Sequence, residues 1–289
     1  MNQKMIKIRW VTTTTFEVVL PSGKVILFDP WVGGETEEFM GPGRTHDIET
    51  KLEDITGADW MFISHAHFDH CADVSNINKR FMEGTNGGRI FLPALSAYAI
   101  AKHYDIPFRD VLPVYPYEEF DFDEFKIKAL PCRHRGDAIP PSETRKRSIE
   151  RGQTEEMMEL GDIGNLDEID WAVTIKECNL RFMVLAGGLY HFNNTPNYCK
   201  EFNPLFVTRQ VSNIIAKDPE TYAKYCHMFH APFVFPSHHD LGIYKDYKEY
   251  TGLFDAANKI LEEQGSITRI INTDRGKWYE IGAYINKLD

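Results

Sequence analysis

Short strand patterns dominate the sequence and come in two series, each accompanied by helical patterns. The first series predicts strands at 6–11, 16–20, 24–30, 60–63, 89–92 and 125–131 and a helix over 94–103. The second predicts strands at 171–175, 181–186, 233–235 and two within 267–282, with helices around 211–215 and over 218–229 and 253–261. Since no linker long or polar enough to separate two domains lies between the series, we expect one α+β domain over residues 1–289. Its two sheets would lie inside and its helices outside.

One segment interrupts this rhythm. Residues 135–169 are largely polar, contain two adjacent prolines, and include a charged helical pattern around 148–160 that ends at Gly161. Long connections inside a domain are usually functional, so we interpret 135–169 as an insertion or lid. We expect substrate specificity to reside in loops such as this one and 31–56.

The charge balance argues against polyanionic partners. The chain has 43 acidic and 32 basic side chains, a net charge of -11, which repels nucleic acid unless a local basic patch overrides it. No apolar run approaches the length of a membrane span, and the first residues lack the pattern of a signal peptide. Five widely spaced cysteines without a Cys-x-x-Cys pair are typical of reduced thiols. We therefore expect a cytoplasmic protein that binds neither nucleic acid nor membrane.

Three histidines and one aspartate lie within six residues, directly after the strand predicted at 60–63. In an extended backbone His65 and His67 project to the same side and can bind one ion, while Asp69 and His70 turn toward a second. Imidazole suits zinc and other first-row metals, and a carboxylate ligand leaves a position open for water. A chance match to this cluster anywhere in the chain has odds of roughly one in a thousand. The cluster predicts a metal centre, for which zinc is the first choice and manganese or iron the alternatives.

At this motif the chain resembles the metallo-β-lactamase superfamily, whose hallmark is His-x-His-x-Asp-His after a strand. The implied fold is a four-layer αβ/βα sandwich. An early strand that ends in Asp-Pro is similar to the start of the family, and the resemblance implies that Asp29 supports the histidine segment from behind. A later strand ending in Leu-Pro-Cys-Arg-His implies His134 as a ligand. A histidine two positions after a proline implies His238, rather than its neighbour His239, as the last ligand.

The chain departs from the family pattern at one element. After the strand equivalent to 181–186 the family usually carries Gly-Asp, whose aspartate bridges two metal ions, and here residue 188 is glycine. Three interpretations stay open: two ions with three ligands each, a single ion, or replacement of the missing ligand by nearby His191. The number of ions, one or two, is therefore left open.

The segment around His238 and His239 also resembles a particular branch of the superfamily. With Asp240 after the two histidines, it looks most like the branch typified by bacterial ascorbate-6-phosphate lactonase. This implies hydrolysis of an ester or lactone of a small molecule, a sugar-derived acid among the candidates, by metal-activated water. Asp69 would be the catalytic residue that holds the water and passes its proton to the leaving group. A phosphodiesterase of the same fold and a non-catalytic ligand-binding member are the alternatives. We expect a small-molecule substrate, and homo-oligomer formation is left open.

The glycine at position 188 generates a prediction about metal affinity. A bridging carboxylate would offset the repulsion between two dications, so its loss weakens the second ion most. We expect the ion on Asp69, His70 and His238 to leave first on mild chelation, and Gly188→Asp to raise the zinc stoichiometry toward two, as titration with a chromophoric chelator would measure. Two tight, indistinguishable ions would contradict this, and His191→Ala would then test that residue as the replacement ligand.

Overall fold

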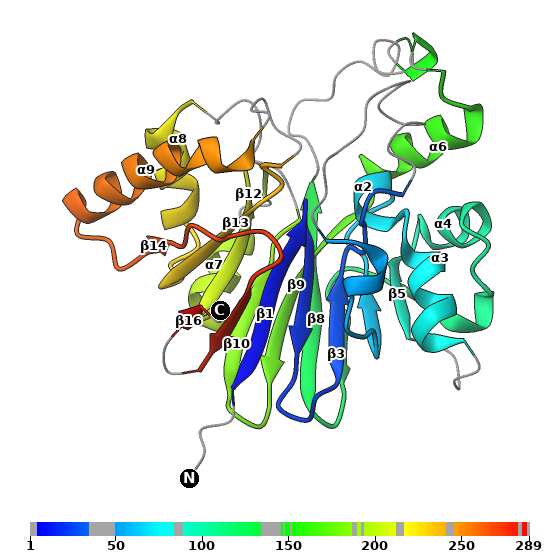
Figure 1. The fold of residues 1–289 in the computed structure, drawn as a ribbon, viewed down its shortest axis with the longest axis horizontal. Helices are drawn as coiled ribbons and strands as arrows, with labels where there is room; N and C mark the ends of the chain where they lie inside the picture. Colours follow the sequence, from blue (N-terminus) through cyan, green and yellow to red (C-terminus); the bar gives the residue numbers. More distant parts are fainter. Residues whose placement is uncertain are drawn as a thin grey trace.

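Two sheets face each other in the computed structural model, and helices cover both outer faces (Figure 1). The described residues are 5–34, 50–83, 89–133, 146, 148–150, 152–186, 190–191, 194–211, 217–240, 246–282 and 285–287. Within these ranges, every helix is too short or too polar to cross a membrane.

The first sheet has the strand order β16-β15-β1-β2-β3-β4-β5-β6 in the described part of the chain. Its strands are β1 (Ile6–Thr12), β2 (Thr15–Val19), β3 (Val25–Phe28), β4 (Trp60–Phe62), β5 (Ile90–Pro93), β6 (Val111–Val114), β15 (Trp278–Ile281) and β16 (Ile285–Lys287). Neighbours from β16 to β3 are antiparallel, and those from β3 to β6 are parallel. The expected hairpin turn between β2 and β3 contains Gly23, whose φ of 91° is a conformation that glycine adopts without strain.

The second sheet has the order β11-β8-β9-β10-β12-β13-β14, with β7 also paired to β8. Its strands are β7 (Glu119–Asp121), β8 (Phe125–Arg133), β9 (Glu168–Ile175), β10 (Leu180–Val184), β11 (Tyr190–His191), β12 (Phe206–Gln210), β13 (Phe233–Ser237) and β14 (Arg269–Ile270). It too changes from antiparallel to parallel pairing, at β10.

The outer layers are helical. In Figure 1, α8 and α9 flank one side of the sheets, and α2, α3, α4 and α6 flank the other. The helices are α2 (Phe68–Cys71), α3 (Val74–Ile77), α4 (Ala97–His103), α6 (Glu155–Gly164), α7 (Asn194–Phe202), α8 (Pro219–His227) and α9 (Thr251–Glu263), with shorter turns η1 (Leu52–Asp54), η2 (Asn78–Met82), η3 (Phe108–Asp110) and η4 (Tyr247–Tyr250). Separate buried clusters join the first sheet to α4 and α6 and the second sheet to α8 and α9. This arrangement confirms the four-layer αβ/βα sandwich.

Aromatic side chains fill the space between the two sheets. Phe62 of β4 is fully buried, and its ring centroid lies 4.5 Å from that of Phe91, 5.1 Å from that of Trp171 and 5.8 Å from that of Phe28. Because Trp171 belongs to β9, these contacts join the two sheets directly beneath the segment that begins at Ser64.

The structure extends or corrects several sequence-based expectations. The apolar pattern does not predict β12, because Thr208, Arg209 and Gln210 are polar although they are buried in this strand. Of the helix expected around 211–215, only Val211 is described, and it follows β12 directly. Residues 212–216 lie outside the described residues.

The segment 135–169 is described only in its second part. There α6 begins after Thr154, whose side chain accepts a hydrogen bond from the Met157 N–H, and it continues through Gly161 to Gly164. Residues 148–150 are also helical, so the expected helix around 148–160 is interrupted before the cap at Thr154, and Gly161 does not end it. The expected insertion also runs into the second sheet, because β9 begins at Glu168.

The central position of Phe62 generates a stability prediction. Phe62→Ala removes the ring that contacts aromatic side chains from both sheets, and such core truncations cost about 3 to 5 kcal/mol. Leu166→Ala serves as the control, because Leu166 is 83% exposed and surface changes usually stay within about 0.5 kcal/mol. Urea denaturation measures both. An equal, small loss for both variants would show that the packing between the sheets does not depend on Phe62.

Candidate metal centre

The predicted ligands in the described residues follow strands that end at one edge of the sandwich. His65 follows β4 and His238 follows β13, while Asp29 follows β3. The two sheets are joined at this edge, because the backbone N–H of His238 donates to the carbonyl of Thr13 at 2.7 Å. The chain therefore brings residues that are up to 209 positions apart into one site, with α2 supplying Asp69 and His70.

His65 and His67 form the first group of nitrogen ligands. Nε2 of His65 lies 3.0 Å from Nδ1 of His67. Nε2 of His67 lies 3.1 Å from the carbonyl oxygen of Gly161 in α6. A carbonyl only accepts, so Nε2 of His67 carries the proton and Nδ1 of the neutral ring carries a lone pair.

Ser64 determines which nitrogen of His65 is protonated. The Ser64 hydroxyl donates to Oδ2 of Asp29 at 2.7 Å, because a carboxylate only accepts. The same hydroxyl oxygen is 2.9 Å from Nδ1 of His65 and accepts its N–H, which leaves a lone pair on Nε2. Two nitrogen lone pairs thus face each other at 3.0 Å in the His65–His67 pair. That arrangement is repulsive by itself and fits a cation bound by both nitrogens.

Asp69, His70 and His238 form the second group. One ligand atom from each residue lies within 4.8 Å of the other two. Nε2 of His238 is 3.0 Å from Oδ2 of Asp69, and Nε2 of His70 is 3.9 Å from the same oxygen. Nε2 of His70 is buried and has no hydrogen-bond partner among the described residues. A buried nitrogen of this kind, beside a carboxylate and a second imidazole, fits a divalent ion such as zinc.

Asp29 orients His70 from the far side of its ring. Nδ1 of His70 lies 2.8 Å from Oδ2 of Asp29, and donation of its proton to the carboxylate leaves the lone pair on Nε2. The same carboxylate accepts the Ser64 backbone N–H at 2.6 Å and the Thr14 hydroxyl at 2.9 Å. Asp29 therefore contacts both His70 and Ser64, and its supporting role stays a prediction.

The charges of the second group support one another. Burial raises the pKa of the Asp69 carboxyl, but the charge of His70 and the hydrogen bond from His238 outweigh it and hold that pKa well below its usual range. Burial lowers the pKa of His238. The hydrogen bond to Asp69 and the charge of that carboxylate outweigh burial, so the pKa of His238 is raised overall. Asp69 is thus an anion at neutral pH, as a metal ligand must be.

His239 lies away from these ligand atoms. Its ring is buried and stacks on Trp10 with centroids 4.3 Å apart, and it also contacts Tyr250 and Phe254. Burial lowers the pKa of His239 to about 4. The structure therefore brings His238 to the second group and packs His239 against aromatic side chains.

Three predicted positions cannot be placed in this centre. His134 and Gly188 lie outside the described residues. The backbone of His191 pairs with Cys132 as part of β11, but its side chain is not described. Their roles stay predictions, as do the ligand roles of the other residues.

A turn of four threonines also lies at this edge, and the sequence patterns do not predict its role. Residues 12–15 connect β1 to β2, and all four side chains are buried. Their hydroxyls donate, in order, to Oδ2 of Asp240 (2.5 Å), the carbonyl of Asp69 (2.8 Å), Oδ2 of Asp29 (2.9 Å) and the carbonyl of Asp29 (2.5 Å). The threonine run in the sequence was the available signal, but its partners are residues far along the chain.

A second missed residue is Glu168, the first residue of β9. Oε1 of this buried carboxyl lies 3.5 Å from Nδ1 of His65. Burial raises the pKa of Glu168 well above its usual value, and the charge of Asp170 adds to the rise. A single glutamate before an apolar strand carries no signal in the sequence.

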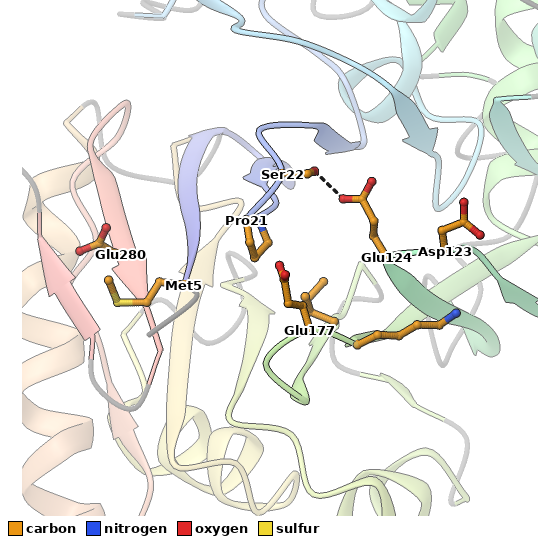
Figure 2. Close-up of a pocket in the computed structure, with 9 residues that line it drawn as sticks. Met5, Pro21, Ser22, Asp123, Glu124, Glu177 and Glu280 are labelled. Carbon is orange, nitrogen blue, oxygen red and sulfur yellow. Dashed lines mark hydrogen bonds between the residues drawn. The ribbon is translucent and has the colours of Figure 1, made fainter. Parts of the chain in front are cut away.

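A pocket of about 740 Å³ lies at the other end of β9. Figure 2 shows it between the turns of both sheets, with Asp123, Glu124, Glu177 and Glu280 around it and a hydrogen bond from Ser22 to Glu124. β9 runs from Glu168 beside the histidines to Ile175 in the pocket wall, a span of about 23 Å for a strand of this length. None of the predicted ligands among the described side chains lines this pocket, so it is separate from the residues gathered at the other end of β9.

Comparison with known proteins places this arrangement in a family. Residues 24–177, more than half of the chain, match the model of a family described as the beta-lactamase superfamily domain. The chain belongs to the beta-lactamase superfamily. A UPF0173 metal-dependent hydrolase of Koribacter versatilis is 38% identical over 80 residues, which are 28% of this chain and 30% of that protein. The chain thus spans less than a third of the length of this curated relative.

Solved structures of the superfamily fold extend over nearly the whole chain. A metallo hydrolase of Ignicoccus hospitalis aligns with a TM-score of 0.63 and 16% identity over 96% of this chain and 98% of that one. An isothiocyanate hydrolase from Delia radicum gut bacteria aligns with a TM-score of 0.63 and 16% identity over 96% of this chain and all of that one. These similarities confirm the fold.

The contact between α6 and His67 generates a prediction that superfamily membership alone does not. A Cβ on Gly164 would lie 2.7 Å from Cδ2 of His67 and 3.1 Å from its backbone nitrogen, whereas one on Gly161 would meet nothing within 4 Å. Gly164→Ala must therefore displace His67, and we expect zinc affinity to fall by about 10-fold or more. Gly161→Ala, in the same helix, should keep the affinity and gain about 1 kcal/mol of stability. Competitive zinc titration and thermal denaturation measure the two effects. Equal zinc affinity in both variants would show that His67 does not bind the metal.

Proposed function

We propose that the chain is a metal-dependent hydrolase that cleaves an ester or lactone of a small molecule. The observation that carries the proposal is the arrangement of two groups of ligand atoms at one edge: the His65–His67 nitrogen pair and the cluster of Asp69, His70 and His238. Zinc is the proposed ion, with manganese or iron as alternatives, and His134 is proposed to complete the first group. Divalent ions at such a centre supply a water acidified to near neutrality and polarise the carbonyl oxygen of the substrate.

The residues of the chain have distinct parts in this reaction. Asp69 has a lowered pKa and stays an anion at neutral pH, so it is suited to orient the attacking water by accepting a hydrogen bond. Asp29 and Ser64 keep lone pairs on the ligand nitrogens of His70 and His65. Transfer of the proton to the leaving group through Asp69 remains the proposed final step.

The choice of substrate rests on resemblance and charge. The sequence around His238 and Asp240 is similar to the lactonase branch, and the net charge of -11 disfavours nucleic acids. The relative from Koribacter versatilis is described as a metal-dependent hydrolase, and one structural neighbour is an isothiocyanate hydrolase. Both descriptions support hydrolysis, and neither names an ester or lactone. We further propose a single domain that acts in the cytoplasm on a small molecule, without nucleic-acid or membrane partners.

A panel of model substrates tests the proposal. The zinc-loaded protein is expected to hydrolyse simple lactones or p-nitrophenyl esters, to lose this activity on chelation and to regain it with zinc. Asp69→Asn should lower kcat by about 10²- to 10⁴-fold, while Asp255→Asn, an exposed position on α9, should not change it. Turnover of bis(p-nitrophenyl) phosphate alone would favour the phosphodiesterase alternative. Zinc binding without turnover of any of these substrates would favour a non-catalytic ligand-binding protein.

A further inference from the structure

We propose that Glu168 is a positioning residue of the metal centre that acts through His65, as Asp29 acts through His70. The inference rests on the proposed metal-dependent function and adds a residue to it. Glu168 would hold the His65 ring in place from behind, without binding the ion itself.

The surroundings of Glu168 point to a partner in the metal centre. The residue is 3% exposed, and neither of its carboxyl oxygens has a nitrogen or oxygen hydrogen-bond partner among the described residues, where the weakly donating Cys132 thiol is its neighbour. A buried carboxyl without such bonds is costly, so its retention calls for a compensating group. Nδ1 of His65, at 3.5 Å from Oε1, is the basic side-chain nitrogen within ion-pair distance in the described part of the chain.

The backbone fixes Glu168 beside the histidine segment. The Ile169 N–H donates to the carbonyl of Ser64 at 3.0 Å, which joins the start of β9 to the residue before His65. Glu168 also pairs with Cys132 in β8, two residues before the predicted ligand His134. The carboxyl group is therefore held at one place relative to the ring, beside the Nδ1–H that the Ser64 hydroxyl accepts.

The side of the His65 ring that Glu168 faces decides whether Glu168 is a metal ligand or a positioning residue. Oε1 of Glu168 lies near Nδ1 of His65, whereas Nε2 of the same ring faces His67. Glu168 thus stands behind the ring, in the position that Asp29 has relative to His70. Carboxylates behind metal-binding imidazoles fix the ring orientation and raise its basicity.

This placement also bears on the glycine at position 188. The family pattern supplies a carboxylate between two ions at that point, and this sequence does not. A carboxyl group that fixes the His65 ring strengthens binding of the first ion without occupying a coordination position. The expected contribution of Glu168 is therefore specific to the ion bound by His65 and His67.

The experiment compares three variants of the full-length protein. Glu168→Met removes the charge and the polar atoms at similar size, and Glu168→Gln removes only the charge. Asp167→Ala is the control: Asp167 is a neighbouring buried carboxylate that accepts the backbone N–H groups of Leu95 and Ser96 at the start of α4. Zinc affinity of each ion is measured by chelator competition, and the melting temperature is measured without zinc.

We expect opposite patterns for the two positions. Glu168→Met should bind the tighter zinc ion 10- to 100-fold more weakly, which is the usual effect of losing such a partner, while its metal-free melting temperature stays equal or rises. Glu168→Gln should show a smaller loss of affinity in the same ion. Asp167→Ala should melt at a lower temperature and bind zinc as the unmodified chain does. In the zinc-loaded protein, the proton resonance of His65 Nδ1–H should shift in both Glu168 variants and not in the control.

Four results would overturn the inference. Unchanged zinc affinity in a folded Glu168→Met protein refutes it while leaving the metal centre intact. A lower melting temperature with unchanged affinity, or failure of both Glu168 variants to fold, shows that Glu168 serves the fold and not the ion. If the unmodified chain binds no zinc, the proposed function fails, and the role of Glu168 fails with it.

Discussion

The carboxylate of Asp29 is the point on which the centre depends. It lies at the end of β3, where the backbone N–H of Asp29 donates to the carbonyl of Phe62, and its side chain binds Ser64, Thr14 and His70. One anion thus connects a β-strand, the turn between β1 and β2, and the histidine segment. Because a buried carboxylate is stable only with several donors around it, these elements hold one another in a single arrangement.

Backbone conformation shows the cost of this arrangement. Thr13, Asp29 and His238 all have positive φ angles, of 38°, 44° and 62°, although none of them is glycine. Such conformations cost about 1 to 3 kcal/mol each and persist where the surroundings enforce them. Here the enforcement comes from mutual contacts: the His238 N–H donates to the Thr13 carbonyl, and the Thr13 hydroxyl donates to the carbonyl of Asp69. The strain therefore lies at the edge that gathers the predicted ligands.

Local sequence patterns predict those structural elements that are determined by residues close together in the chain. Most strands and the segment from His65 to His70 follow from periodicity and spacing, and the resemblance to a known family adds Asp29 and His238. The partners of the threonine turn could not be predicted, because Thr13 and Asp240 are 227 positions apart. β12 could not be predicted because several of its buried residues are polar. Glu168 could not be predicted because its role depends on the approach of β9 to Ser64. Long-range polar contacts, which leave no periodic trace, account for what the sequence alone does not reveal.

The return of β15 to the first sheet has a consequence for how the protein is made. β1 lies between β2 and β15, and β16 pairs with β15, so the sheet that carries the histidine segment stays incomplete until residue 287 has been synthesised. His238 also reaches the edge only when β13 has joined the second sheet. Since a chain emerges from the ribosome N-terminus first, the segment from His65 to His70 spends much of translation without Glu168 and His238. The predicted ligands are thus brought together only after β13 has been synthesised, and a product that ends before this strand would leave the histidine segment without His238.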